Sequence, residues 1–117
     1  MALAKVELGG GRVAYIREEI TVGQAEDFTF LVTHWIGDDA GKELRGAIVY
    51  AIVFVERFDG FDGLDWPKLD EVSVDVDSPE VAARYKATRR NLSLAMLKSI
   101  MNEVDKRMSP SEKLEGN

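Results

Sequence analysis

Acidic side chains are concentrated in one stretch of the sequence, residues 57–78, which reads RFDGFDGLDWPKLDEVSVDVDS. Seven carboxylates and one lysine lie between Asp59 and Asp77, and carboxylate oxygens are ligands that calcium and magnesium prefer. The first three acids recur at every third position, whereas an EF-hand loop needs acids at alternate positions, a central glycine and a distal glutamate. We therefore expect a solvated acidic loop built from turns, with no metal site and no cofactor.

Side chains that could act as nucleophiles or bases are few. The chain has no cysteine and a single histidine, His34, so thiol catalysis and multi-histidine metal sites are excluded. A Ser or Thr nucleophile would need His34 as its base, but its position beside Trp35 near an expected helix end favours a packed or surface role. The glycines at 9–11 are not followed by the lysine and helix start of a phosphate-binding loop. We expect a protein that is not an enzyme.

The segment RYKATRR, residues 84–90, is the best candidate for contact with phosphates. On a helix, Lys86, Arg89 and Arg90 share one face. The net charge of the chain is −6, no helix-turn-helix signature is present, and basic residues do not alternate with aromatic ones. We therefore favour a solvated face, or one paired with the acidic loop, and keep nucleic-acid binding as the alternative.

The N-terminal third predicts a hairpin followed by a helix. The glycines at 9–11 separate two short segments of mixed apolar and polar residues, 5–8 and 12–20, a pattern typical of a β-hairpin. Thr21 and Gln24 form a T-x-x-Q capping box, which marks the start of a helix. Its apolar positions recur at steps of three and four, and Gly37 is well placed to end it.

Residues 47–55, AIVYAIVFV, form a run of nine apolar side chains. Periodicity cannot separate a buried helix from a buried strand in such a run. We choose a helix across residues 41–58, because the segment is long for a strand and has no internal turn. A helix that is apolar all round needs cover on more than one face, so it is either central or partly covered by another chain.

The C-terminal third predicts one long helix. Ser78-Pro79 supplies a capping residue and a proline at the first helical position, and the amphipathic pattern continues to about Met108. Together these elements predict an α+β fold in a single domain over residues 1–108, with an N-terminal β-hairpin, about three helices, and an acidic loop or short strand before the last helix. Residues 109–117 are expected to be a flexible C-terminal tail. No apolar run approaches the roughly 18 residues of a membrane span, so we expect no membrane association.

The order of these features resembles the tail assembly chaperones of long-tailed bacteriophages and related prophage particles. The resemblance covers most of the chain. It rests on Ile16-Arg17-Glu18 leading into Ile20-Thr21-Val22-Gly23, an apolar helix, the acidic Asp65-Trp66-Pro67 turn and a final helix.

The resemblance implies a non-enzymatic chaperone in the host cytoplasm. Its client would be the long, helical tape-measure protein, which it would keep from aggregating until tail-tube subunits polymerise around it; a homo-oligomer is also expected. The apolar content of the helices predicts a client or self-association surface comprising Phe28, Leu31, Trp35, Val49, Val53, Phe54, Met96 and Met101. The alternative for this surface is that the fold buries these side chains. The alternative functions are a small nucleic-acid-binding regulator that uses residues 84–90 and, more distantly, an ion-binding enzyme fragment.

Overall fold

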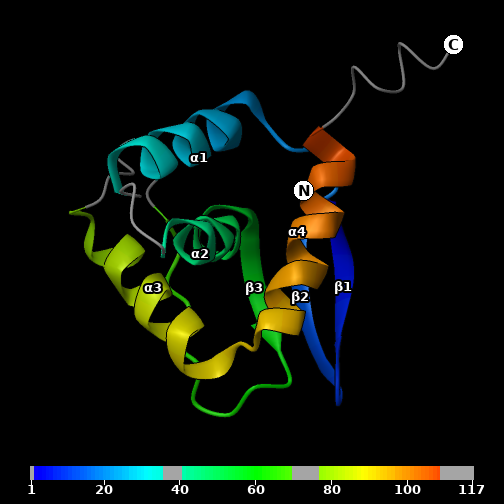
Figure 1. Cartoon of the computed structure of the whole chain (residues 1–117). Helices are drawn as coiled ribbons and strands as arrows, with labels where there is room; N and C mark the ends of the chain where they lie inside the picture. The colour runs from blue at the N-terminus through cyan, green and yellow to red at the C-terminus, as the bar shows by residue number, and fades with distance from the viewer. Residues whose placement is uncertain (1, 36–40, 70–76, 109–117) are drawn as a thin grey trace, which may run out of the picture.

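The computed structural model describes residues 2–35, 41–69 and 77–108 and shows a small antiparallel sheet beside a group of helices (Figure 1). In chain order the elements are β1 (Leu3–Gly9), β2 (Arg12–Arg17), α1 (Val22–Trp35), α2 (Lys42–Phe54), β3 (Val55–Asp59), α3 (Pro79–Asn91) and α4 (Leu94–Met108). The predicted α+β class is confirmed, although the described residues hold four helices. Three expectations fall wholly or partly outside these residues: a helix stop at Gly37, the acidic loop or short strand before the last helix, and a flexible tail at 109–117.

The N-terminal hairpin forms as predicted. β1 pairs antiparallel with β2, and Gly9, Gly10 and Gly11 all have positive φ at the turn, with values of 90°, 63° and 77°. Side chains at such φ values are strained, which explains why three glycines occur together here.

A third strand replaces the end of a predicted helix. Residues 55–58 were expected to continue the helix that begins near residue 41, but the helix ends at Phe54 and β3 begins at once. β3 pairs antiparallel with β2, so the sheet order is β1-β2-β3. Pairing with β2 supplies backbone hydrogen-bond partners for β3, and the ion pair between Arg17 and Glu56 joins the two strands.

The apolar helix α2 lies at the centre of the molecule, with α1, α3 and α4 packed around it (Figure 1). Every residue from Ile48 to Phe54 except Tyr50 is buried. The expected cover on several faces is therefore provided by the chain's own helices.

The capping box of α1 is confirmed and also ties α1 to α2. Thr21 Oγ1 accepts a hydrogen bond from the Gln24 backbone N–H at 3.1 Å, and Gln24 Oε1 lies 3.5 Å from the Thr21 backbone nitrogen. The same Gln24 side chain donates through Nε2 to the carbonyl oxygen of Val53 at 3.4 Å. Val53 lies in the last turn of α2, where carbonyl groups lack partners within the helix.

The predicted long C-terminal helix is two helices. α3 ends at Asn91, and Leu92 has the extended values φ −103° and ψ 139°. Ser93 then caps α4, since its Oγ accepts a hydrogen bond from the backbone N–H of Met96 at 3.2 Å. Serine competes for backbone hydrogen bonds inside helices and is favoured at their N-termini, which explains the break.

A buried arginine, Arg84, joins α3 to the end of α2 and to the acidic turn. The sequence pattern had placed it mostly outward, yet it is only 3% exposed. Its Nη1 donates to the carbonyl oxygens of Ile52 at 2.7 Å and Val55 at 2.9 Å, and its Nε donates to that of Pro67 at 2.8 Å. Its guanidinium lies over the ring of Trp66, whose Nε1 also donates to Val55. A cation therefore satisfies carbonyls at the negative end of the α2 dipole.

Candidate functional site

The predicted client surface is largely core. Five of its eight residues are buried: Leu31, Val49, Val53, Phe54 and Met96. Phe28 and Met101 are partly buried, and the side chain of Trp35 lies outside the described part of the structure. These five side chains are therefore part of the core, because α1, α3 and α4 pack around α2 and bury their apolar faces against it.

The exposed apolar side chains are a different set. Within the described ranges, the large apolar side chains that remain exposed are Val22 (77%), Phe30 (38%), Leu44 (48%) and Leu94 (63%). All four lie on helices, and each lines one of two shallow depressions. Periodicity did not single out this set, because three of the four lie in the first turn of a helix, where neighbouring elements rather than the helical repeat decide which side chains are covered.

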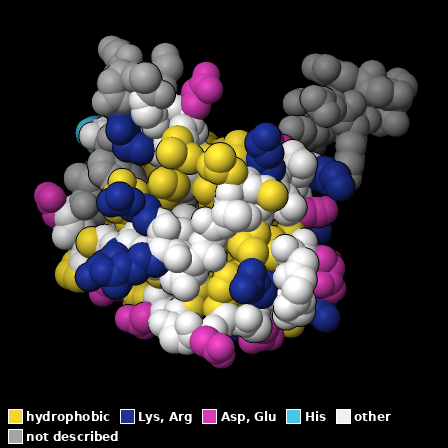
Figure 2. Space-filling model, turned by 60° about the horizontal axis from the view of Figure 1, so that its bottom comes forward, with side chains coloured by type: hydrophobic (Ala, Val, Ile, Leu, Met, Phe, Trp, Pro, Cys, Tyr) yellow, Lys and Arg dark blue, Asp and Glu magenta, His cyan; other side chains and the backbone are white. Residues whose placement is uncertain are grey.

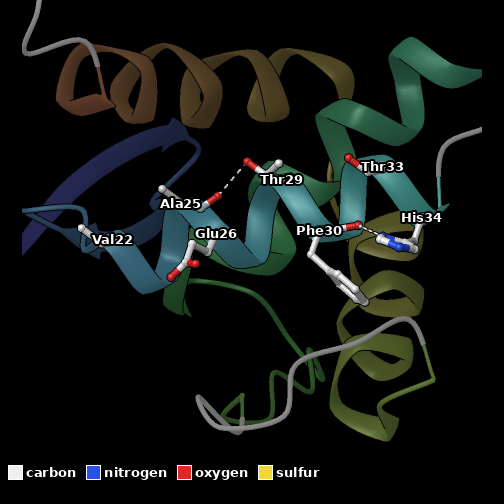
Figure 3. A pocket seen from close by; sticks show the side chains of 7 residues that line it. All are labelled: Val22, Ala25, Glu26, Thr29, Phe30, Thr33 and His34. Atoms are coloured by element: carbon white, nitrogen blue, oxygen red, sulfur yellow. Dashed lines mark hydrogen bonds between the residues drawn. The ribbon is translucent and has the colours of Figure 1, made fainter.

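The first depression, of about 490 Å³, lies on the outer face of α1 (Figure 3). Figure 3 shows its lining residues along one side of the helix: Val22, Ala25, Glu26, Thr29, Phe30, Thr33 and His34. Thr29 Oγ1 donates to the Ala25 carbonyl at 3.0 Å, and His34 Nδ1 lies 2.9 Å from the Phe30 carbonyl. These side chains are engaged by the backbone of their own helix, so the face presents mainly small and apolar groups.

The second depression, the interhelical groove, lies between α2, α3 and α4 and encloses about 410 Å³. Leu44 and Ile48 from α2 form one wall, and Leu92, Leu94 and Leu97 form the opposite wall. The lining is completed by Gly41, Arg45, Tyr85, Thr88 and Arg89. The break between α3 and α4 creates this wall, because it turns the chain and brings leucines from both sides of Ser93 beside the start of α2.

The three basic residues singled out in the sequence, Lys86, Arg89 and Arg90, line an adjoining depression with Tyr85. Their side chains are exposed, as predicted for a solvated face. Among the residues that the structure describes, no ion pair involves any of the three, although Arg89 lies 5.6 Å from the centre of the Tyr85 ring. Figure 2, which brings the lower side of Figure 1 forward, shows Lys and Arg side chains beside hydrophobic ones on a single face.

The acidic stretch shows no ion site within its described residues. The Asp59 carboxylate accepts a hydrogen bond from Arg57 Nη1 at 2.9 Å. This contact holds the pKa of the Asp59 carboxyl below its usual value. In the described part of the chain, no group of three or more His, Cys, Asp or Glu side chains is placed to hold a metal ion. Residues 70–76, which carry the remaining acids except Asp77, lie outside it.

The described surface combines apolar and basic side chains in two adjoining depressions. No helix within the described ranges is both long and apolar enough to cross a membrane. The side chains gathered at the groove and the basic depression are mainly leucines, an isoleucine, an aromatic ring and cations. Comparison with protein-family models, curated proteins and solved structures gives no match to this chain.

Proposed function

We propose that the chain is a non-enzymatic tail assembly chaperone of a long-tailed phage or prophage, which binds helical segments of the tape-measure protein in the host cytoplasm. One observation carries the proposal: the four exposed large apolar side chains of the described residues all line depressions on helical surfaces. Singly exposed apolar side chains are ordinary, whereas apolar groups gathered in a concavity are typical of binding sites. The resemblance described above supplies the identity of the client.

The interhelical groove is the proposed client site. An amphipathic helix binds such a groove through apolar anchors at positions i, i+3, i+4 and i+7, and this mode tolerates many sequences that share the pattern. A protein that must keep a long helical client from aggregating needs this tolerance, because the client presents many different helical segments.

The outer face of α1 is the proposed self-association site. Ala25, Thr29 and Thr33 recur at intervals of four and are small, so a second helix can approach this face closely. Val22 and Phe30 would supply apolar contact beside them. Two separate apolar faces allow one copy to hold a neighbour and a client together.

The test is the aggregation of a tape-measure fragment, followed by light scattering with and without the full chain. We expect the wild type to suppress scattering, and the groove variant Leu44→Asp with Leu94→Asp to lose this activity while retaining its helical circular dichroism. The matched control, Ala82→Asp with Ala95→Asp, changes exposed helical positions that line neither depression and should behave as wild type. A wild type that leaves the scattering unchanged would refute the proposed function.

A small nucleic-acid-binding regulator is the second candidate, and the exposed cations of α3 favour it. Against it stands the net charge of −6, which opposes binding to a polyanion. Tight binding to labelled duplexes that falls steeply with salt and disappears in Arg89→Glu with Arg90→Glu would support this candidate.

A further inference from the structure

The apolar groove and the basic depression are parts of one continuous surface. Tyr85 and Arg89 line both of them. Moving across this surface, the lining changes from leucines of α2 and α4 to the cations of α3. An occupant that fills the groove therefore has its flank next to Lys86, Arg89 and Arg90.

Within the part of the chain that the structure describes, these cations have no carboxylate partner, whereas several other cations do. Arg17 pairs with Glu56, Arg57 pairs with Asp59, and Lys106 and Arg107 both pair with Glu103. In the described ranges, Lys86, Arg89 and Arg90 form no such pair although the chain carries 21 acidic side chains. Three exposed cations of one helix, beside an apolar groove, are complementary to an acidic ligand.

We propose that the occupant of the interhelical groove is an acidic amphipathic helix of the client. Its apolar stripe packs between Leu44 of α2 and Leu94 of α4, and carboxylates along one flank contact the three cations of α3. The cations are spaced at i, i+3 and i+4, which matches carboxylates repeated at the same intervals on a helix beside them. This inference rests on the proposed function, because it describes the chemistry of that client.

The lining of the site favours a helix over a nucleic acid or a second copy of the chain. Bases need aromatic platforms to stack on, and Tyr85 is the single aromatic side chain among the residues lining the two depressions. Five apolar side chains in the groove would remain unused by a phosphate backbone. A second copy would have to present an exposed acidic helix with an apolar stripe, whereas α1, which carries the other exposed apolar face, shows Glu26 as the one acid at its depression.

The test uses the full chain and three fluorescent peptides of about 18 residues, long enough to form helix. The first has a leucine stripe and a glutamate flank, the second has lysines in place of the glutamates, and the third keeps the glutamates but has glutamines in place of the leucines. Affinities are measured by fluorescence anisotropy for wild type, for Lys86→Glu with Arg89→Glu and Arg90→Glu, and for the control Lys5→Glu. Lys5 is an exposed lysine of β1 that lines neither depression.

We expect wild type and the control to bind the first peptide, with leucines and glutamates, roughly tenfold or more tightly than the second peptide, with leucines and lysines. The third peptide, which lacks the leucine stripe, should bind least. The triple variant should reverse the order of the two charged peptides, a result that loss of folding cannot produce. Equal affinity for both charged peptides, an unchanged order in the triple variant, or tighter binding to a single-stranded oligonucleotide lost in that variant would each overturn the inference.

Two results separate this inference from the proposed function. If the triple variant suppresses aggregation of the tape-measure fragment as well as wild type does, the acidic-helix inference is wrong and the chaperone function stands. If the charge preference is found but wild type leaves the fragment's aggregation unchanged, the chaperone function is wrong and the acidic-helix inference stands.

Discussion

Replacement of Arg84 tests whether one buried cation holds the end of α2. In Arg84→Met the side chain keeps much of its length and apolar contact but loses its donors. The carbonyl of Val55 keeps the indole N–H of Trp66 as a partner, whereas the carbonyls of Ile52 and Pro67 lose the arginine donors described above. The variant therefore leaves two acceptors without these bonds and removes a cation from the interior.

The expected loss follows from these two acceptors. An unsatisfied buried acceptor costs about 1–3 kcal/mol, so two cost about 2–6 kcal/mol. The Pro67 bond is only part-buried, and methionine removes the cost of burying a cation, which is visible in the pKa of Arg84, lowered by burial to about 10. Because a pKa of about 10 is still well above neutral pH, Arg84 carries its charge at pH 7 in the folded as well as the unfolded protein. We therefore expect a net loss of about 2–4 kcal/mol in the free energy of unfolding.

Urea unfolding followed by far-ultraviolet circular dichroism measures this loss. The matched control is Arg90→Met, which changes an exposed arginine of the same helix and should shift the free energy of unfolding by no more than about 0.5 kcal/mol. Arg84→Lys should fall between the two, since an ammonium keeps the charge but not the planar fork. If Arg84→Met and Arg90→Met are equally stable, Arg84 does not anchor α2.

Three further predictions concern the turns, the helix break and pH. Gly60→Ala should destabilise the fold by more than Gly63→Ala in thermal unfolding, because both glycines have positive φ but only at Gly60 would a Cβ overlap the carbonyl oxygen of Gly11; equal losses would contradict this. Ser93→Ala should cost about 1 kcal/mol in urea unfolding by removing the cap of α4, and no loss would mean that the cap contributes little. Burial and then a hydrogen bond to a carboxylate of α4 raise the pKa of Tyr50 from 10.0 to about 12. The folded state therefore holds this proton more tightly, and the associated stability, fully present below pH 10, is lost as the pH rises towards 12; Tyr50→Phe should flatten this loss in unfolding measured across that range, and an unchanged slope would count against it.

Local signals in the sequence predicted the parts of the fold that are fixed locally. The glycines at 9–11 and the Thr21–Gln24 pair act on residues within a few positions, so a turn and a helix start follow from the sequence directly. The change from α2 to β3 at Val55 depends on pairing with β2, far away in the chain, and a buried valine suits a helix end or a strand equally well. No local pattern carries that information.

The burial of Arg84 and the helix break at Ser93 are two further differences from the sequence-based expectations. In α3, Arg84 lies on one stripe with Val81 and Thr88, and all three are buried, whereas the sequence pattern had grouped Arg84 with the outward-facing basic residues. Its charge argued for solvent, and the carbonyls that compensate for its burial come from elements that sequence reasoning could not place. Ser93 was a readable capping signal, and once it is read, the groove beside Leu94 follows from the turn between α3 and α4.

The direct passage from α2 into β3 affects how the groove can change shape. No linker residue separates Phe54, the end of α2, from Val55, the start of β3, so we expect α2 and the sheet to move as one unit. The groove lies beside the N-terminal half of α2. A hinge needs residues whose φ and ψ can absorb a rotation, and no linker residue is present between α2 and β3 to serve as one. The extended Leu92 lies on the other wall, so we expect a bulkier or slimmer occupant to be accommodated by a change in the angle between α3 and α4, with α2 and the sheet keeping their relative position.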